Sequence, residues 1–234
     1  MVLTKVSASI LACNTLYLGD NVVKIAQAGA DIIHVDIMDG HYVNNLSFGP
    51  NTVRDLRQII SLPIEVHLEL YNPEKFISDF AKAGADVITV QLDCCVHPIR
   101  IFNTIKNHGK KVGLAINPCM DINQIKYFVK YIDYLLLMSV EPGFGGQDFE
   151  ETTLQKVKEA KSLLKRLGIN LPIGVDGGVN LQNYELIKKA GVDILVIGSA
   201  LFSETDLTDT ISKFKGMVAN YNCRRQKFGC SLET

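Results

Sequence analysis

Short apolar, β-branched runs recur along the chain, and each follows a segment whose apolar residues are spaced as on one face of a helix. Three of these transitions share the motif Ala-Gly-Ala/Val-Asp, around Gly29, Gly84 and Gly191. Glycine ends a helix, and the apolar strand begins within one or two residues. The three glycines are 55 and 107 residues apart. These separations correspond to two and four units of about 27 residues, a natural size for a strand with its crossover helix.

Eight such units nearly fill the chain. The pattern predicts strands at 6–11, 32–37, 64–68, 87–91, 112–116, 134–138, 172–175 and 194–197. Helices are expected between them, for example at 17–28, 73–83, 122–131, 152–167 and 181–190. Near-continuous apolar strands separated by helices are typical of a parallel sheet that is buried on both faces. Eight alternations favour a closed (β/α)₈ TIM barrel, and a doubly wound open sheet is the alternative.

Composition favours a single core-forming domain. The chain has 234 residues, of which 47% are hydrophobic, and no Pro/Ser-rich linker or charge block divides it. We therefore expect one barrel domain over 1–220. The segment 221–234 has no periodic pattern and is expected to be a flexible tail.

Charge and cysteine usage exclude several classes of protein. The net charge is −1, from 24 basic and 25 acidic residues, and no basic block favours nucleic acid. No apolar run is long enough to span a bilayer, and residues 1–5 lack the apolar region of a signal peptide. The six cysteines are scattered and show no C-x-x-C spacing, so reduced thiols are expected. These features predict a cytoplasmic protein without nucleic-acid or membrane partners.

Candidate chemistry begins with His34 and Asp36, at the end of the second expected strand. Alternate residues of a strand share a face, so the imidazole and the carboxylate point the same way. In a barrel of this kind, functional groups lie at the C-terminal ends of the strands. His67 and Asp176 occupy equivalent positions on the third and seventh strands. Together these four side chains predict a nitrogen/oxygen site for a divalent metal.

Glycine-rich loops follow three strands at the same end of the barrel. They are the segment 138–147, the pair Gly177-Gly178 and the pair Gly198-Ser199. Glycines allow backbone N–H groups to close on an anion, and the loops after strands 7 and 8 form the recurrent phosphate site of barrels. The loops therefore predict a phosphorylated small molecule as ligand, with its phosphate on these loops and its other end over the metal.

Four stretches resemble one known family, the ribulose-phosphate 3-epimerases. They are His-Val-Asp-Ile-Met-Asp-Gly-His at 34–41, Met-Ser-Val-Glu-Pro-Gly-Phe-Gly-Gly-Gln at 138–147, Val-Asp-Gly-Gly-Val at 175–179 and Gly-Ser-Ala-Leu-Phe at 198–202. The resemblance covers essentially the whole chain. It implies a phosphate-binding TIM barrel in the pentose phosphate pathway that uses one divalent metal ion to interconvert ketopentose 5-phosphates at C3. It also implies assembly into a homo-oligomer.

Carried over residue by residue, the resemblance assigns roles to named positions. The implied metal ligands are His34, Asp36, His67 and Asp176, and Asp36 and Asp176 are the implied catalytic acid/base pair. The implied substrate contacts are Ser9, His67, Gly143, Phe144, Gly145, Gly146, Asp176, Gly177, Gly178, Gly198 and Ser199.

This chemistry is reasonable on its own terms. Inverting a carbon next to a ketone requires one group to remove its proton and a second group to return a proton on the other face. A metal ion would stabilise the intermediate enediolate as a Lewis acid, and no organic cofactor is needed. Zn²⁺, Fe²⁺, Mn²⁺ and Co²⁺ all suit a mixed histidine/aspartate set.

Some residues depart from the family pattern. Ala8 and Asn44 stand where the family usually has proline, Glu69 where it usually has methionine, and Gln91 where histidine is common. Glu69 and Gln91 are therefore candidate specificity residues. The alternative functions are a 3-epimerase of a ketohexose 6-phosphate, such as allulose 6-phosphate, and a non-catalytic phosphosugar-binding barrel. A related decarboxylase is disfavoured, because no lysine lies between Asp36 and Asp39.

Overall fold

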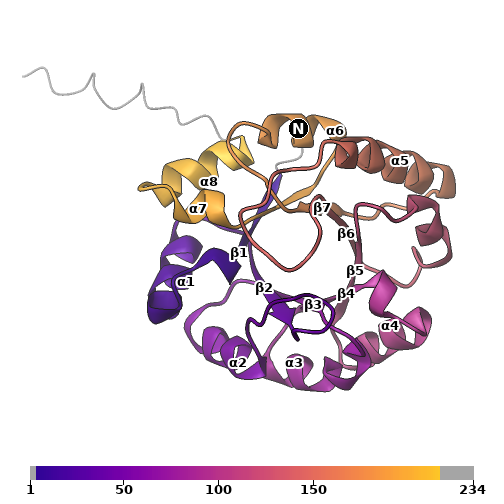
Figure 1. Ribbon diagram of the computed structural model, residues 1–234, viewed down its shortest axis with the longest axis horizontal. Coiled ribbons are helices and arrows are strands. Elements are labelled where there is room, and N and C mark those ends of the chain that lie inside the picture. The colour runs from indigo at the N-terminus through magenta and orange to yellow at the C-terminus, as the bar shows by residue number, and fades with distance from the viewer. Residues whose placement is uncertain (1–3, 217–234) are drawn as a thin grey trace, which may run out of the picture.

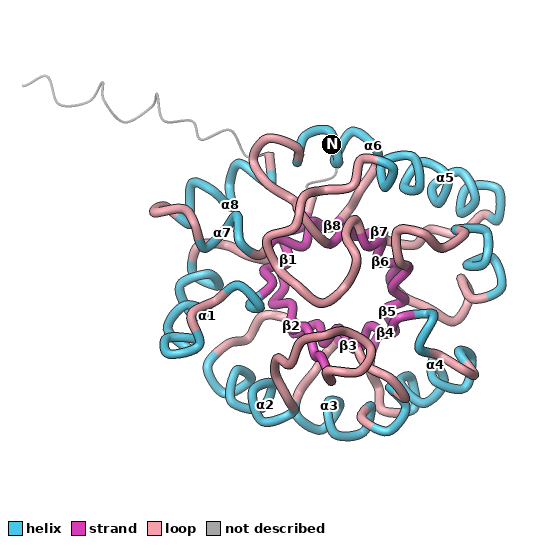
Figure 2. The backbone as a smooth tube through the Cα atoms, viewed as in Figure 1, coloured by secondary structure: helices cyan, strands magenta, loops and turns pink. Residues whose placement is uncertain are grey.

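The computed structural model describes residues 4–216. Eight parallel strands pair in chain order and close into a barrel, with the helices outside it (Figures 1 and 2). The predicted (β/α)₈ barrel is therefore confirmed, and the open-sheet alternative is wrong. The expected tail, 221–234, and the boundary at 220 lie outside the described residues. Within 4–216, no helix is long and apolar enough to cross a membrane.

Each of the eight strands lies where the apolar runs predict it. The strands are β1 (Lys5–Ser9), β2 (Ile32–Met38), β3 (Ile64–Glu69), β4 (Val87–Gln91), β5 (Lys111–Ile116), β6 (Tyr134–Met138), β7 (Ile173–Asp176) and β8 (Ile194–Ile197). The first ends two residues earlier than expected, because Ile10–Ala12 form a 3₁₀ turn. The Ser9 hydroxyl caps that turn by accepting the N–H of Leu11.

The α-helices surround the strands. They are α1 (Leu18–Gln27), α2 (Pro50–Ile59), α3 (Ile77–Ala83), α4 (Pro98–Asn107), α5 (Thr152–Leu167), α6 (Tyr184–Ala190), α7 (Ser199–Phe202) and α8 (Leu207–Lys215).

Three predicted helices differ in detail. The segment expected at 122–131 is a 3₁₀ helix, Ile122–Tyr127, and its buried Ile122 and Ile125 are three residues apart, the repeat of a 3₁₀ turn. The segment expected at 73–83 is a 3₁₀ turn, Pro73–Lys75, followed by α3. The helix expected from 181 starts later, at Tyr184. The Asn180 side chain accepts the N–H groups of residues 182 and 183 and holds them in a turn.

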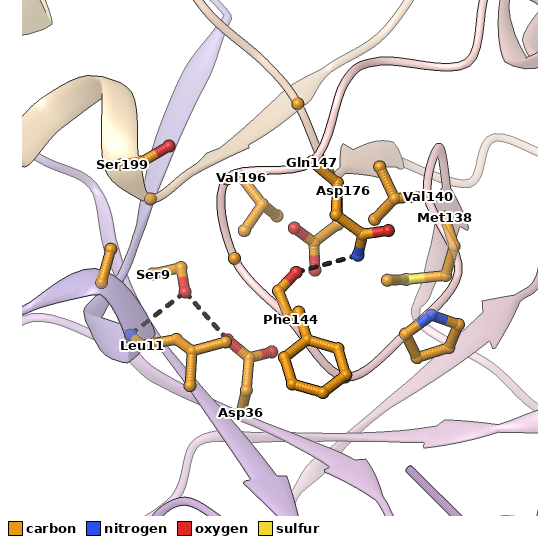
Figure 3. A pocket seen from close by; sticks show the side chains of 18 of the residues that line it. Ser9, Leu11, Asp36, Met138, Val140, Phe144, Gln147, Asp176, Val196 and Ser199 are labelled. Carbon is orange, nitrogen blue, oxygen red and sulfur yellow. Dashed lines mark hydrogen bonds between the residues drawn. The ribbon is translucent and has the colours of Figure 1, made fainter. Parts of the chain in front are cut away.

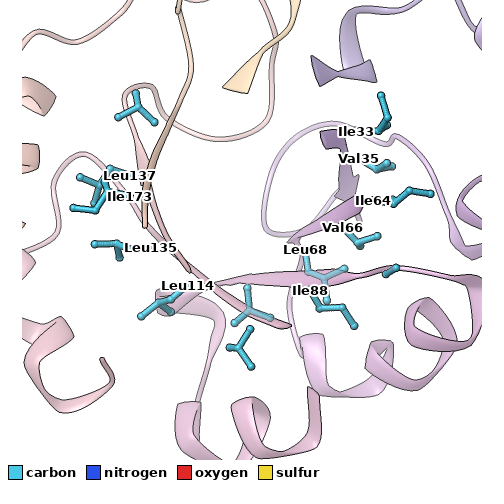
Figure 4. Close-up of a cluster of buried hydrophobic side chains, with 14 of the residues drawn as sticks. Ile33, Val35, Ile64, Val66, Leu68, Ile88, Leu114, Leu135, Leu137 and Ile173 are labelled. Carbon is cyan, nitrogen blue, oxygen red and sulfur yellow. The ribbon is translucent and has the colours of Figure 1, made fainter. Parts of the chain in front are cut away.

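The main hydrophobic core lies between the barrel and the helices (Figure 4). Residues such as Ile33 and Val35 of β2 point outward into it, so the residues that alternate with them point into the barrel. On β6 and β8 these inward residues are largely apolar and form a second small cluster that includes Leu136 and Val196. On β2 and β3 most of them are polar and buried, and these polar residues form the candidate site.

At the opposite end of the barrel, four aspartates tie the strands together in pairs. Each precedes an even-numbered strand, and its side chain accepts the backbone N–H of a residue at the start of the strand before it. The bonds are Val6 N to Asp31 (2.8 Å), Ile64 N to Asp86 (2.8 Å), Val112 N to Asp133 (2.9 Å) and Ile173 N to Asp193 (2.8 Å). Three of these aspartates belong to the repeated motif, and Asp133 is a fourth copy without its Ala-Gly.

Candidate active site

The candidate site is a cavity at the C-terminal ends of the strands (Figure 3). Asp36 of β2 and Asp176 of β7 line it, together with Glu69 of β3. The loop after β6 contributes Phe144, a residue that is 55% exposed. The barrel therefore brings residues that are far apart in the sequence into one polar cavity.

Strand register brings the four predicted metal ligands together. Asp36 pairs with His67 across β2 and β3. One atom from each of His34, Asp36, His67 and Asp176 lies within 4.8 Å of the others. The Asp36 Oδ1 atom is 2.9 Å from His34 Nε2 and 3.1 Å from His67 Nδ1. The Asp176 Oδ2 atom is 3.5 Å from His34 Nε2 and 3.9 Å from His67 Nδ1. Atoms at these separations can share one ion at about 2.1 Å.

In each histidine, the ring nitrogen that faces away from the cluster has the kind of polar neighbour expected for a metal-binding imidazole. The Nδ1 atom of His34 lies 3.1 Å from Glu65 Oε2, and the Thr89 hydroxyl donates to Glu65 Oε1 at 2.7 Å. A carboxylate in this position holds the ring in the tautomer that leaves the other nitrogen free for a metal.

His67 has a comparable partner in Gln91. The Nε2 atoms of the two side chains are 3.1 Å apart, while Gln91 Oε1 is buried without a partner. Exchanging the amide oxygen and nitrogen of Gln91 would pair this oxygen with an N–H at His67 Nε2 and leave Nδ1 for the metal. The surroundings of both histidines therefore fit a bound ion.

The electrostatics of the cluster also favour a cation. Burial by itself would lower the pKa of His34, but the charges of Asp36 and Glu65 raise this pKa well above its usual value. Among the described residues, Asp36, Glu65, Glu69 and Asp176 have no lysine or arginine within ion-pair distance. A divalent ion would compensate this buried negative charge.

The two aspartates differ in surroundings. Burial raises the pKa of Asp36, but the charge of His34 and hydrogen bonds from both histidines outweigh it, so the pKa lies well below its usual value. The Ser9 hydroxyl donates to Asp36 Oδ2 at 2.8 Å (Figure 3). For Asp176, burial is the dominant cause and raises the pKa to about 6. Each carboxylate therefore has one oxygen at the histidine cluster and another that is not needed there.

The loop after β7 is packed tightly against the loop after β6. Gly177 and Gly178 have φ angles of +109° and +60°. A Cβ atom at Gly178 would lie 2.7 Å from the Cα atom of Phe149. The N–H of Ser139 donates to the carbonyl of Asp176 at 2.7 Å. Only glycine permits this approach, which brings backbone groups to the edge of the cavity.

Ten of the eleven predicted substrate contacts line the cavity. They are Ser9, Gly143, Phe144, Gly145, Gly146, Asp176, Gly177, Gly178, Gly198 and Ser199. His67 is fully buried behind them and belongs to the cluster of four side chains that could hold a metal ion. Of the two candidate specificity residues, Glu69 lines the cavity, whereas Gln91 lies behind His67 and does not reach it.

Glu65 is a residue of the candidate site that sequence reasoning missed. The signal was available, because period two along β3 puts Glu65 on the same face as His67 and Glu69. Met38 and Met138 also line the cavity and shield it with apolar surface.

A barrel with buried carboxylates, a cluster of side chains that could hold a metal and glycine loops is typical of metal-assisted enzymes that act on small phosphorylated molecules. A family model for the ribulose-phosphate 3 epimerase family matches residues 5–202. The chain is 41% identical over 213 residues to ribulose-phosphate 3-epimerase of Bacillus subtilis, covering 91% of this chain and 98% of the relative. It is 39% identical over 215 residues to the Escherichia coli K12 enzyme, covering 92% and 96%. The chain belongs to the ribulose-phosphate 3-epimerase family.

Solved structures share the fold at much lower identity. One is KGPDC from Streptococcus mutans, with a TM-score of 0.71 and 14% identity over 92% of this chain and 97% of that one. Another is a 3-hexulose-6-phosphate synthase, with a TM-score of 0.64 and 16% identity over 93% and 100%. These likenesses support the barrel fold alone. The chain is an epimerase of the carbohydrate isomerase class, and family membership implies a phosphorylated sugar substrate.

Proposed function

We propose that this chain interconverts D-ribulose 5-phosphate and D-xylulose 5-phosphate by inverting C3. The observation that carries the proposal is the placement of Asp36 and Asp176 on strands separated by β8 and β1, both at one histidine cluster. A sugar between these strands would present opposite faces of one carbon to the two carboxylates.

Asp36 and Asp176 exchange roles with the direction of the reaction. One carboxylate removes the C3 proton from its face of the sugar, and the other acid delivers a proton to the opposite face. The negative charge left at C3 is delocalised onto the neighbouring ketone oxygen. Ser9 orients Asp36 through the hydrogen bond to Oδ2, while Met38 and Met138 exclude water from the cavity.

We propose that His34, Asp36, His67 and Asp176 hold one divalent ion, which is Zn²⁺, Fe²⁺, Mn²⁺ or Co²⁺. When bound, such an ion stabilises the negative charge on the substrate oxygens as a Lewis acid. Elemental analysis of protein purified without chelators should give one ion per chain, and a His34→Ala variant should retain almost none. Metal that persists at full occupancy in this variant would contradict the assignment.

The substrate phosphate is proposed to bind the loops after β6, β7 and β8. Gly177, Gly178 and Gly198 line the cavity there, and Ser199 begins α7, whose first N–H groups lack intrahelical partners. These groups suit a phosphate dianion.

Solvent-exchange NMR tests the function directly. Incubation of the purified protein with ribulose 5-phosphate in D₂O should incorporate deuterium at C3 and produce xylulose 5-phosphate. Allulose 6-phosphate, offered in parallel, tests the ketohexose alternative. Tight binding of either sugar without any exchange at C3 would instead indicate a non-catalytic sugar-binding barrel.

Two further properties are proposed from the family resemblance. Assembly into a homo-oligomer is testable by light scattering coupled to size-exclusion chromatography. A cytoplasmic location is testable by fractionation of the source cells.

A further inference from the structure

Glu69 is a buried carboxylate at the edge of the cavity without a protein partner for one of its oxygens. It is the last residue of β3 and only 2% exposed, yet it lines the cavity. Its Oε1 atom is 3.8 Å from His67 Nδ1, and its Oε2 atom has no hydrogen-bond partner within the described chain. A buried acceptor left unpaired is costly, by roughly 1–3 kcal/mol for a neutral group and more for a charged one.

Glu65 on the same face of the same strand provides the contrast. One of its oxygens accepts the Thr89 hydroxyl and the other lies against His34. Glu65 is therefore fully engaged within the protein, whereas Glu69 is not. Glu69 also lies outside the set of four atoms that converge within 4.8 Å. Glu69 lines the cavity, so a rotation of its carboxylate about the last side-chain bond would bring an unpaired oxygen to a ligand there.

The order of strands indicates which end of the ligand Glu69 meets. In the eight-stranded ring β3 lies directly across from β7, and Figure 2 shows the two on opposite sides of the barrel. The proposed phosphate loops follow β6, β7 and β8, and Asp36 and Asp176 define the position of the reacting carbon. A ketose 5-phosphate in this orientation runs from its phosphate through C4 and C3 to the ketone at C2. Its remaining end, the C1 hydroxymethyl group, then points toward β3.

We propose that Glu69 accepts a hydrogen bond from the C1 hydroxyl of the ketose phosphate and makes this chain selective for substrates that carry it. The proposal rests on the proposed function and adds a recognition role for a residue outside the acid/base pair. A methyl group at C1 would leave Glu69 buried and unpaired, and this penalty is the source of the selectivity.

Two substrates that differ only at C1 provide the test. The kcat/KM values for D-xylulose 5-phosphate and 1-deoxy-D-xylulose 5-phosphate are compared in the holoenzyme, with turnover followed by NMR. The ratio of kcat/KM for D-xylulose 5-phosphate to that for the 1-deoxy sugar should be roughly twofold to tenfold higher in the wild type than in a Glu69→Met variant, the range for a hydrogen bond to a neutral group. Comparing ratios between proteins cancels the intrinsic reactivity of each ketone.

A Glu69→Gln variant keeps one acceptor oxygen and should fall between the other two proteins. It also replaces Glu69→Met if that variant fails to fold. Metal content is measured in each protein, and Glu69 variants should retain one ion per chain. Calorimetric titration with each sugar phosphate provides a readout that is independent of turnover.

The outcomes separate the two proposals. If the wild type and both variants show the same substrate ratio while all are active, the role of Glu69 is refuted and the epimerase function stands. Loss of metal from the variants would also refute it, because Glu69 would then act on the ion. A wild-type protein that turns over neither sugar would refute the proposed function and the Glu69 proposal together.

Discussion

The carboxylate of Glu65 lies behind the imidazole of His34, with Oε2 3.1 Å from Nδ1. The other ring nitrogen faces Asp36 at 2.9 Å. The two residues are direct neighbours in the β2–β3 register, so the strands themselves impose this pairing. A carboxylate in this place favours a proton on Nδ1 of His34.

Replacing Glu65 should therefore weaken metal binding without removing a ligand. Glu65→Leu should lower the affinity for the ion by about 10- to 100-fold, the usual effect of removing such a partner. Competition with a chromophoric chelator measures the affinity. Thr89→Val, which deletes only the hydroxyl bound to Glu65 Oε1, should have a smaller effect. Equal affinities in the wild type and Glu65→Leu would show that the carboxylate does not tune His34.

Gln91 should support metal binding through His67, as Glu65 does through His34. Gln91→Leu removes the polar group at 3.1 Å from His67 Nε2 and should speed the loss of the ion. Gln91→His restores the side chain that is common in the family and should recover much of the retention. Release rates are measured by trapping with an indicator dye. Indistinguishable rates for the leucine and histidine variants would argue that Gln91 only fills space.

The acid/base pair makes a prediction about stereochemistry. Asp36→Asn and Asp176→Asn should each lower epimerisation by about 10²- to 10⁴-fold, because in each variant one face of C3 lacks its proton carrier. The remaining aspartate should still exchange the C3 proton of one epimer. NMR in D₂O should therefore show deuterium entering ribulose 5-phosphate in one variant and xylulose 5-phosphate in the other.

Metal content must be measured in both variants, since each aspartate is also a proposed ligand. A variant that keeps its ion and near-normal turnover would rule out the two-base scheme.

The close packing at Gly178 predicts that alanine is tolerated less well there than at Gly146, another glycine of the proposed phosphate loops. Gly178→Ala places a side chain at φ +60° and against the backbone of Phe149. Gly146→Ala is the matched control, because it also has a positive φ, +75°, but its Cβ would meet nothing within 4 Å. The backbone term is about 1–2 kcal/mol at each position.

Gly178→Ala should accordingly show the larger fall in Tm and a clearly higher KM for the sugar phosphate. Thermal melts and steady-state kinetics on both variants provide the comparison. A Gly146→Ala variant that is as impaired as Gly178→Ala would mean that backbone conformation, and not the approach to Phe149, limits this loop.

The barrel and the clustering of the four proposed ligands could be predicted, because both follow from periodicity. Alternation along β2 and β3 places His34, Asp36 and His67 on the inward face, and the rule that strand ends carry the chemistry adds Asp176. The helix expected at 122–131 is a shorter 3₁₀ helix, because residue spacing alone does not distinguish a 3₁₀ repeat from an α-helical one. The surroundings of Glu69 and Gln91 could not be predicted, because they depend on register across β2, β3 and β4. That register brings Gln91 to His67 and leaves Glu69 facing the cavity.

The four aspartates at the far end of the barrel bear on how such a chain can change over evolutionary time. Asp31, Asp86, Asp133 and Asp193 each fasten one pair of strands, so the scaffold consists of four similar quarters. None of these fastenings uses a residue that lines the cavity. Substitutions at the cavity, such as a glutamate at position 69 where the family usually has methionine, can therefore change which sugar binds. The four aspartate bonds that join the strands are not affected by them. The residues that maintain the fold and the residues that can alter substrate choice thus lie at opposite ends of the same strands.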